Sequence, residues 1–303
     1  MHFDEYQRQA QETDQSPQGT TVEDGNKEQL IPFLGMAGEV GSLLSEYKKL
    51  LRDGPVHLHF KEQVKEELGD ILWYVANVAT KFGLSLEEVA AGNIQKTRDR
   101  WLAQRERKPR IFDADYPEKE QLPRQFEYIL TYGLDEKGAR KVMVCDINGK
   151  QVGNFLTDNA LEEDGYRFHD VLHLAHAALL GWSPVFRKLL GRKRKSSARV
   201  DEVQDGGRAG VIDEALVAIE FEYARRHNMF EGAKTVDWEL LRTIKRLTDG
   251  LEIRVITARE WEQAILQGFK VWRDIRRHDG GIVRGDMNTG TFEFSPLPDL
   301  QKT

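Results

Sequence analysis

The sequence predicts an all-α four-helix bundle followed by a mostly helical α+β domain with a small β-hairpin or sheet. Apolar residues recur at helical spacing through the first hundred residues, and a stretch rich in proline and charge follows at 106–123. Strand-like segments and further helical patterns lie beyond that stretch. We therefore expect a domain at 1–105, a linker at 106–123 and a second domain at 124–303.

The composition is that of a globular protein in water, with 40% hydrophobic and 31% charged residues. The net charge of −6 gives no general signature of polyanion binding, so nucleic acid is not an expected partner. The single cysteine, Cys145, excludes an intrachain disulfide framework. The N-terminus does not resemble a secretory signal, and no apolar run approaches the ~18 residues of a membrane span. A cytoplasmic protein without membrane contact is expected.

Four helical patterns occupy the first domain, separated by short loops that favour a bundle. They cover residues 4–13, 28–52, 61–82 and about 85–105. Ser85 and Glu88 form a capping box at the start of the fourth. The second helix has an apolar face made of Leu30, Phe33, Leu34, Ala37, Val40, Leu43, Leu44, Tyr47 and Leu51.

The second domain begins with strand patterns and continues with helical ones. Strands are expected at 126–132 and 141–146, a hairpin turn at Asn148-Gly149, and a last strand at 291–295. The expected helices cover residues 166–181, 211–228, 237–249 and 259–277.

Carboxylates gather on two helices of the first domain. Glu39 and Glu46 lie two turns apart on one face, and Glu67 and Asp70 share a face of the next helix, with Glu66 beside them. Converging carboxylates repel one another unless a cation neutralises them, and Mg²⁺ prefers oxygen ligands. The alternative is a solvated acidic face paired with nearby lysines. The costly helical glycines at positions 35, 38, 41 and 69 favour close approach of a helix or a ligand, and hence the metal site.

These residues also carry a resemblance to a known family. The segments GMAGEVGSLLSEYKK (35–49), EELGDILWY (66–74) and NIQKTRDRW (93–101) resemble the MazG-like all-α pyrophosphohydrolases, which have an ExxE motif followed by ExxD. The resemblance covers about residues 5–105. One departure stands out, because Ser42 occupies the position of the second glutamate of ExxE.

The resemblance implies hydrolysis of a nucleoside triphosphate to a monophosphate and pyrophosphate with Mg²⁺, or alternatively Mn²⁺. It transfers Glu39, Glu67 and Asp70 as metal ligands, and Glu46 or Glu66 is a candidate to hold or deprotonate the attacking water. The candidate substrate-binding residues are Asn93, Lys96, Arg100 and Trp73. Their alternative roles are surface charge and, for the tryptophan, core packing. The family also pairs its subunits, so a homodimer or homotetramer is expected.

Ser42 leaves a second interpretation open. Loss of one acidic ligand is compatible with a nucleotide sensor that binds without turnover and acts through the second domain, in stress or phage defence for example. Retained activity is the favoured interpretation because the rest of the motif is intact.

Histidines are the sharpest feature of the second domain. His169, His173 and His176 occupy one helical face, where imidazoles are suited to bind a transition metal. The alternative is a polar core seam in which they bond to Glu214 and Glu220. A basic run at 187–195 precedes glycines at 206–210, and it is predicted to be a solvated loop, with phosphate binding as the alternative.

Overall fold

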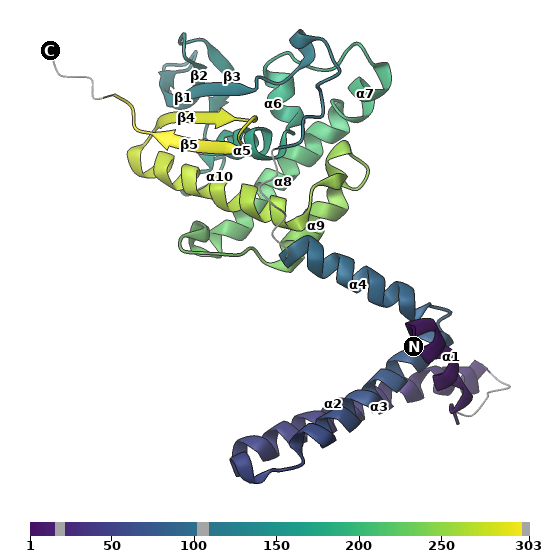
Figure 1. Cartoon of the computed structure of the whole chain (residues 1–303). Coiled ribbons are helices and arrows are strands. Elements are labelled where there is room, and N and C mark those ends of the chain that lie inside the picture. The colour runs from purple at the N-terminus through teal and green to yellow at the C-terminus, as the bar shows by residue number, and fades with distance from the viewer. Residues whose placement is uncertain (16–21, 102–108, 299–303) are drawn as a thin grey trace. The chain divides into compact units, whose positions relative to one another are not determined.

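The computed structural model describes residues 1–15, 22–101 and 109–298 (Figure 1). The chain forms two compact units, Met1–Arg98 and Asp99–Thr303. Among the described residues, no helix has the length and apolar character needed to cross a membrane.

The described residues of the first unit form helices joined by short turns, without strands, as predicted. Its elements are α1 (Phe3–Glu12), α2 (Val22–Asp53), the 3₁₀ turn η1 (Gly54–Val56), α3 (Phe60–Lys81) and α4 (Leu86–Trp101), whose last turn enters the second unit. Helix α2 begins at Val22 and is therefore longer than the expected 28–52. Ser85 caps α4 as predicted, since its hydroxyl accepts the Glu88 amide at 3.2 Å.

Helices α2 and α3 lie side by side over their length, and α1 packs on α3 (Figure 1). The buried core of this unit is small. Ala10, Ala76 and Leu86 form it, and Tyr6 and Trp73 pack against it. Most of the apolar face predicted for the second helix consequently remains at the surface of the single chain. The exposed side chains on α2 include Leu30, Phe33, Leu34, Val40, Leu44, Tyr47 and Leu51.

The second unit is α+β, in agreement with the predicted fold class. Its strands are β1 (Gln125–Leu134), β2 (Arg140–Asp146), β3 (Gln151–Leu156), β4 (Gly281–Asp286) and β5 (Thr291–Ser295). Its helices are α5 (Asp170–Leu180), α6 (Pro184–Leu189), α7 (Ala198–Val203), α8 (Gly207–Arg225), α9 (Trp238–Thr248) and α10 (Ala258–His278). Short 3₁₀ turns are η2 (Glu118–Glu120), η3 (Tyr166–Phe168), η4 (Asn228–Phe230) and η5 (Glu252–Val255).

The strands form one antiparallel sheet in the order β3-β2-β1-β4-β5. Helices α5 and α10 pack against each other and against β4 and β5 (Figure 1). Aromatic residues fill the core between the helices: the rings of Phe221 and Trp272 are 5.5 Å apart, and those of Phe230 and Phe269 are 5.3 Å apart. Burial of large side chains in this unit contrasts with the small core of the first.

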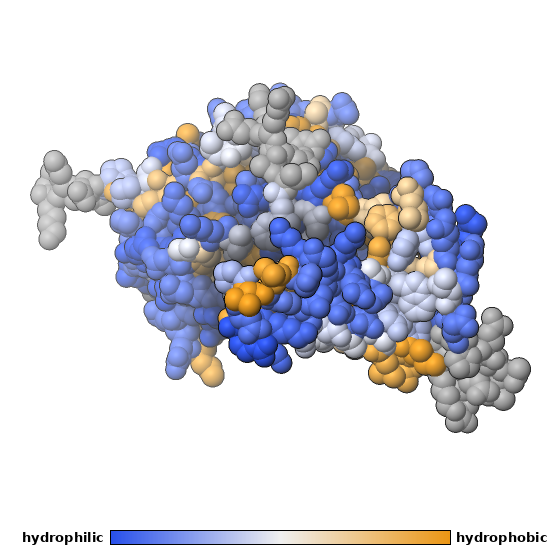
Figure 2. All heavy atoms as spheres, turned by 60° about the horizontal axis from the view of Figure 1, so that its bottom comes forward, coloured by the Kyte–Doolittle hydropathy of each residue, from blue (hydrophilic) through white to orange (hydrophobic). Residues whose placement is uncertain are grey.

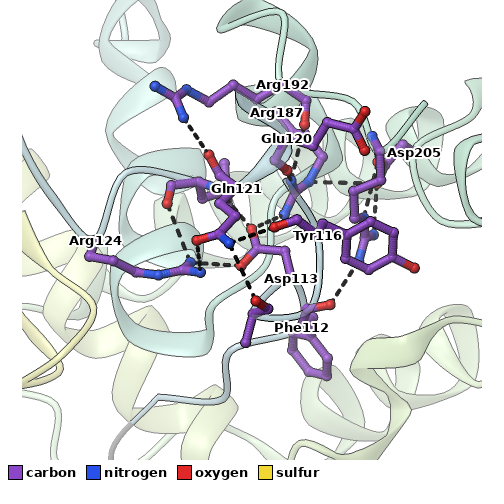
Figure 3. Close-up of polar contacts among 12 residues, drawn as sticks. Phe112, Asp113, Tyr116, Glu120, Gln121, Arg124, Arg187, Arg192 and Asp205 are labelled. Atoms are coloured by element: carbon purple, nitrogen blue, oxygen red, sulfur yellow. Dashed lines mark hydrogen bonds and ion pairs between the residues drawn. The ribbon is translucent and has the colours of Figure 1, made fainter. Parts of the chain in front are cut away.

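The described part of the expected linker, 109–123, packs into the second unit instead. Asp113 is 1% exposed, and one of its carboxylate oxygens accepts the Leu122 amide at 2.7 Å (Figure 3). The Arg110 carbonyl passes so close to Gly181 that a Cβ there would lie 1.8 Å from its oxygen. Prolines and charges in this stretch suggested a linker, but the charges form specific buried ion pairs.

The basic run at 187–195 is also not a solvated loop. Arg187 bonds through its guanidinium to Asp113 at 2.7 Å and to the Glu120 carbonyl at 2.6 Å (Figure 3). Arg194 is 1% exposed and pairs with Asp205 at 2.8 Å and Glu252 at 2.7 Å. The predicted solvated loop is therefore wrong for these arginines, because their acidic partners lie far away in the sequence.

Candidate functional site

The structure brings three of the predicted metal ligands together. One carboxylate oxygen from each of Glu39, Glu67 and Asp70 lies within 4.8 Å of the others. Glu39 projects from α2, and Glu67 and Asp70 project from α3, where a spacing of three residues places both on one face. Glu39 and Glu67 are half-buried and Asp70 is exposed, so the cluster opens to solvent.

The cluster has the electrostatic character of a cation site. Partial burial raises the pKa of Glu67, and the carboxylates of Glu39, Asp70 and Glu46 raise it further. A raised pKa means that adjacent negative charges oppose ionisation of this group. The donor set consists of oxygen atoms alone, which fits Mg²⁺ or Mn²⁺ better than a softer metal.

Close packing between α2 and α3 positions the cluster. A Cβ added to Gly35 would lie 2.2 Å from ring atoms of Tyr74, so a larger residue at position 35 would displace this ring. Glu39 lies one turn after Gly35 and Asp70 one turn before Tyr74. This contact between α2 and α3 therefore lies next to the carboxylates. At the other helical glycines, positions 38, 41 and 69, an added Cβ would meet open space.

The two candidate catalytic glutamates have different surroundings. Glu46 is 6% exposed and pairs with Lys49 and with His57, whose Nε2 lies 3.1 Å from its carboxylate. The Lys49 bond, and then the His57 bond, hold the pKa of Glu46 below its ordinary value, against its partial burial. Glu66 is exposed on α3. Sequence reasoning missed His57, because a single histidine in a loop has no periodic signal.

Two of the predicted substrate-binding side chains have packing contacts. Trp73 donates its indole N–H to the Thr13 hydroxyl at 2.8 Å, in keeping with the core-packing alternative. Arg100 belongs to the second unit, where it donates to the Val236 carbonyl at 3.0 Å and lies over the Trp238 ring at 5.4 Å.

The other two predicted substrate-binding residues remain available to a ligand. Asn93 and Lys96 are exposed on the same face of α4, one turn apart.

The three histidines predicted as metal ligands separate into two groups. His169 and His173 lie with Glu214 in a set whose ligating atoms are within 4.8 Å of one another. His176 instead places Nε2 3.2 Å from Glu220, and both are at most 1% exposed. The predicted trio is therefore not brought together around one point, because His176 is paired inside the core.

The ionisation of His176 reflects this pairing. Burial alone lowers the pKa of a histidine, but Glu220 and Asp213 outweigh it and raise the pKa of His176 to about 9. The same balance raises the pKa of His173 well above its ordinary value, with Asp213 and Glu214 as the opposing charges.

Two families of known domains match separate parts of the chain. Residues 30–102 match the family model of the MazG nucleotide pyrophosphohydrolase domain, and residues 107–298 match that of the MazG C-terminal domain. The Gene 37 protein of Mycobacterium phage L5 is 33% identical over 102 residues, which are 33% of this chain and 89% of that protein. No solved structure matches the chain. The acidic cluster falls within the first match, and the histidines fall within the second.

Proposed function

Because the chain belongs to the MazG family, with a nucleotide pyrophosphohydrolase domain followed by a MazG C-terminal domain, we propose that it hydrolyses nucleoside triphosphates to monophosphates and pyrophosphate. The convergence of Glu39, Glu67 and Asp70 is the observation that carries this proposal. Hydrolysis of a triphosphate depends mainly on positioning and charge neutralisation, and a divalent cation held by carboxylates supplies that neutralisation.

Different residues of the chain have different roles in the proposed hydrolysis. Glu39, Glu67 and Asp70 would hold Mg²⁺, or alternatively Mn²⁺, through oxygen atoms. Glu66 is exposed on α3 next to Glu67 and is the better placed of the two candidates to orient the attacking water, since Glu46 is already paired. Lys96 and Asn93 have exposed side chains suited to contact phosphate oxygens.

We expect Mg²⁺-dependent release of pyrophosphate from at least one nucleoside triphosphate. The measurement is pyrophosphate release from a panel of ribo- and deoxynucleoside triphosphates, with Mg²⁺, with Mn²⁺ and with EDTA. Release in EDTA equal to that in Mg²⁺ would contradict the metal requirement, and release of inorganic phosphate alone would contradict cleavage between the α and β phosphates.

Ser42 favours a second candidate function, a nucleotide sensor. The family pattern has a glutamate there, so this chain presents one acidic ligand fewer. A sensor would bind a triphosphate with Mg²⁺ in equilibrium dialysis and return it unchanged. The nucleotide panel separates the two functions, because turnover by the folded protein excludes the sensor.

We also propose that the protein is a homodimer or homotetramer assembled through its first unit. Leu34, Leu44 and Leu51 on α2 are 62%, 64% and 70% exposed in the single chain, far more than an apolar helix face normally is. Figure 2 shows hydrophobic side chains at the surface of the face that it draws. Pairing α2 with the α2 of a second copy would bury Leu34, Leu44 and Leu51.

Light scattering during gel filtration should therefore give a mass of two or four chains of 34.8 kDa. Leu44→Glu should shift this mass toward one chain, because a charge would then enter the apolar contact. Leu161→Glu, the same change at a fully exposed leucine of the second unit, is the control. A wild-type mass of one chain at micromolar concentration would contradict the assembly.

A further inference from the structure

A buried imidazole nitrogen in the second unit has no hydrogen-bond partner. His173 is 2% exposed, and its Nε2 makes no hydrogen bond among the described residues, with a carboxylate oxygen of Glu214 3.3 Å away as an ion-pair partner. Its Nδ1 lies 3.0 Å from a carboxylate oxygen of Asp213. The other Asp213 oxygen accepts the Ser183 hydroxyl at 2.6 Å and the Val185 amide at 3.1 Å. Asp213 is thus fixed on both oxygens and holds the His173 ring in one orientation.

His169 is oriented in the same way. Its Nδ1 lies 2.8 Å from the Tyr166 carbonyl, and its ring stacks on the Tyr166 ring at 4.4 Å with an angle of 8°. A carbonyl or carboxylate oxygen only accepts hydrogen bonds, so Nδ1 carries the proton in both histidines. Nε2 is therefore the nitrogen that each ring has left to bind a metal.

The third member of the group supplies an oxygen ligand. Glu214 on α8 places Oε2 3.3 Å from His173 Nε2, without hydrogen-bond geometry. Two ligands bound to tetrahedral Zn²⁺ at about 2.0–2.1 Å are about 3.3 Å apart. The ligating atoms of His169, His173 and Glu214 all lie within 4.8 Å of one another, so small side-chain movements would close the site.

The charges around the group also favour a cation. Asp213 is fully buried beside His173, Asp170 lies 3.4 Å from His169 Nε2, and the Glu214 side chain is 53% exposed. A divalent ion bound to His173 Nε2 would lie among these carboxylates, whose negative charges would stabilise it.

We propose that His169, His173 and Glu214 form a site for a divalent transition metal of the Zn²⁺ type, which links the start of α5 to α8. Two imidazoles and a carboxylate are a common zinc ligand set, and three protein ligands leave a fourth position open. The exposure of Glu214 gives that position access to solvent. The site is independent of the proposed hydrolytic function, because its residues belong to the other unit.

Cobalt absorption spectroscopy on the full chain, freed of any affinity tag and of metal, tests the site. Co²⁺ bound by two imidazoles and a carboxylate in four-coordinate geometry should give visible absorption bands that one equivalent of Zn²⁺ removes. Glu214→Gln should abolish these bands. It should also weaken Zn²⁺ binding at least about 10-fold, because loss of a residue that only supports a ligand already lowers metal affinity by about that factor. The half-exposed Glu214 makes this change compatible with folding.

Two further variants complete the test. Glu222→Gln, an exposed change on the same helix, removes the same charge and should keep the bands. Glu67→Gln should also keep them, because it alters only the acidic cluster of the first unit. Wild-type protein without these bands, or equal bands in Glu214→Gln and Glu222→Gln, would overturn the proposal and leave His173 as a protonated partner of Asp213.

Discussion

Glu67→Gln should lower the rate of pyrophosphate release by at least about 100-fold, the order of effect seen when an enzyme loses one charge-stabilising group. Glu67 interacts with both other ligands, because the negative charges of Glu39 and Asp70 add to partial burial in raising its pKa. The amide keeps the shape of the side chain and removes the charge that a cation requires. Mn²⁺ titration followed by electron paramagnetic resonance should show weaker binding in the same variant.

Glu62→Gln is the matched control for this change. Glu62 is exposed in the first turn of α3 and lies outside the group of converging carboxylates. It should retain the wild-type rate and the wild-type affinity for Mn²⁺. A Glu67→Gln protein that stays folded and hydrolyses nucleotides at the control rate would show that the acidic cluster is not the active site.

Arg187→Met should destabilise the second unit by about 3–5 kcal/mol, the usual cost of removing one partner from a buried ion pair. Arg187 is 3% exposed and joins Asp113, the Glu120 carbonyl and the Arg192 carbonyl through one guanidinium (Figure 3). Methionine fills similar apolar space but removes one of the two arginines that pair with the buried Asp113 carboxylate, so that Arg124 alone remains. Urea unfolding followed by tryptophan fluorescence measures the change.

Lys188→Met provides the control for this experiment. Lys188 is the next residue of α6 and is exposed, so its loss should change the free energy of unfolding by no more than about 0.5 kcal/mol. Equal midpoints for the two variants would mean that the Arg187 network contributes little to stability. Trp182, Trp261 and Trp272 are buried in the second unit and report its unfolding.

Local patterns in the sequence predicted most of the elements. The apolar repeats gave all four helices of the first unit, and the Asn148-Gly149 turn lies between β2 and β3 as expected. The strand β4, Gly281–Asp286, was missed. Glycines flank and interrupt it, and Gly285 faces the ring of Phe126 at a distance that leaves no room for a Cβ. Such a strand is stabilised by pairing with β1 and β5 rather than by the strand preference of its own residues.

The candidate site was predictable where its residues repeat along one helix. Spacing alone placed Glu39 and Glu46 on one face of the second helix and Glu67 and Asp70 on one face of the next, and the family pattern selected Glu39, Glu67 and Asp70 as the ligands. Spacing also put His176 with His169 and His173, but its ring turns to Glu220 in the core. Spacing along one helix also gave no sign of the buried arginines. Arg187 and Asp113 are 74 residues apart, so their pairing depends on the whole fold.

The approach of Gly35 to Tyr74 limits the size of the residue at position 35. A larger residue there would have to displace the Tyr74 ring or be accompanied by a smaller residue at position 74. Because Glu39 and Asp70 are each one turn away, a wider separation of α2 and α3 would also enlarge the space between the carboxylates.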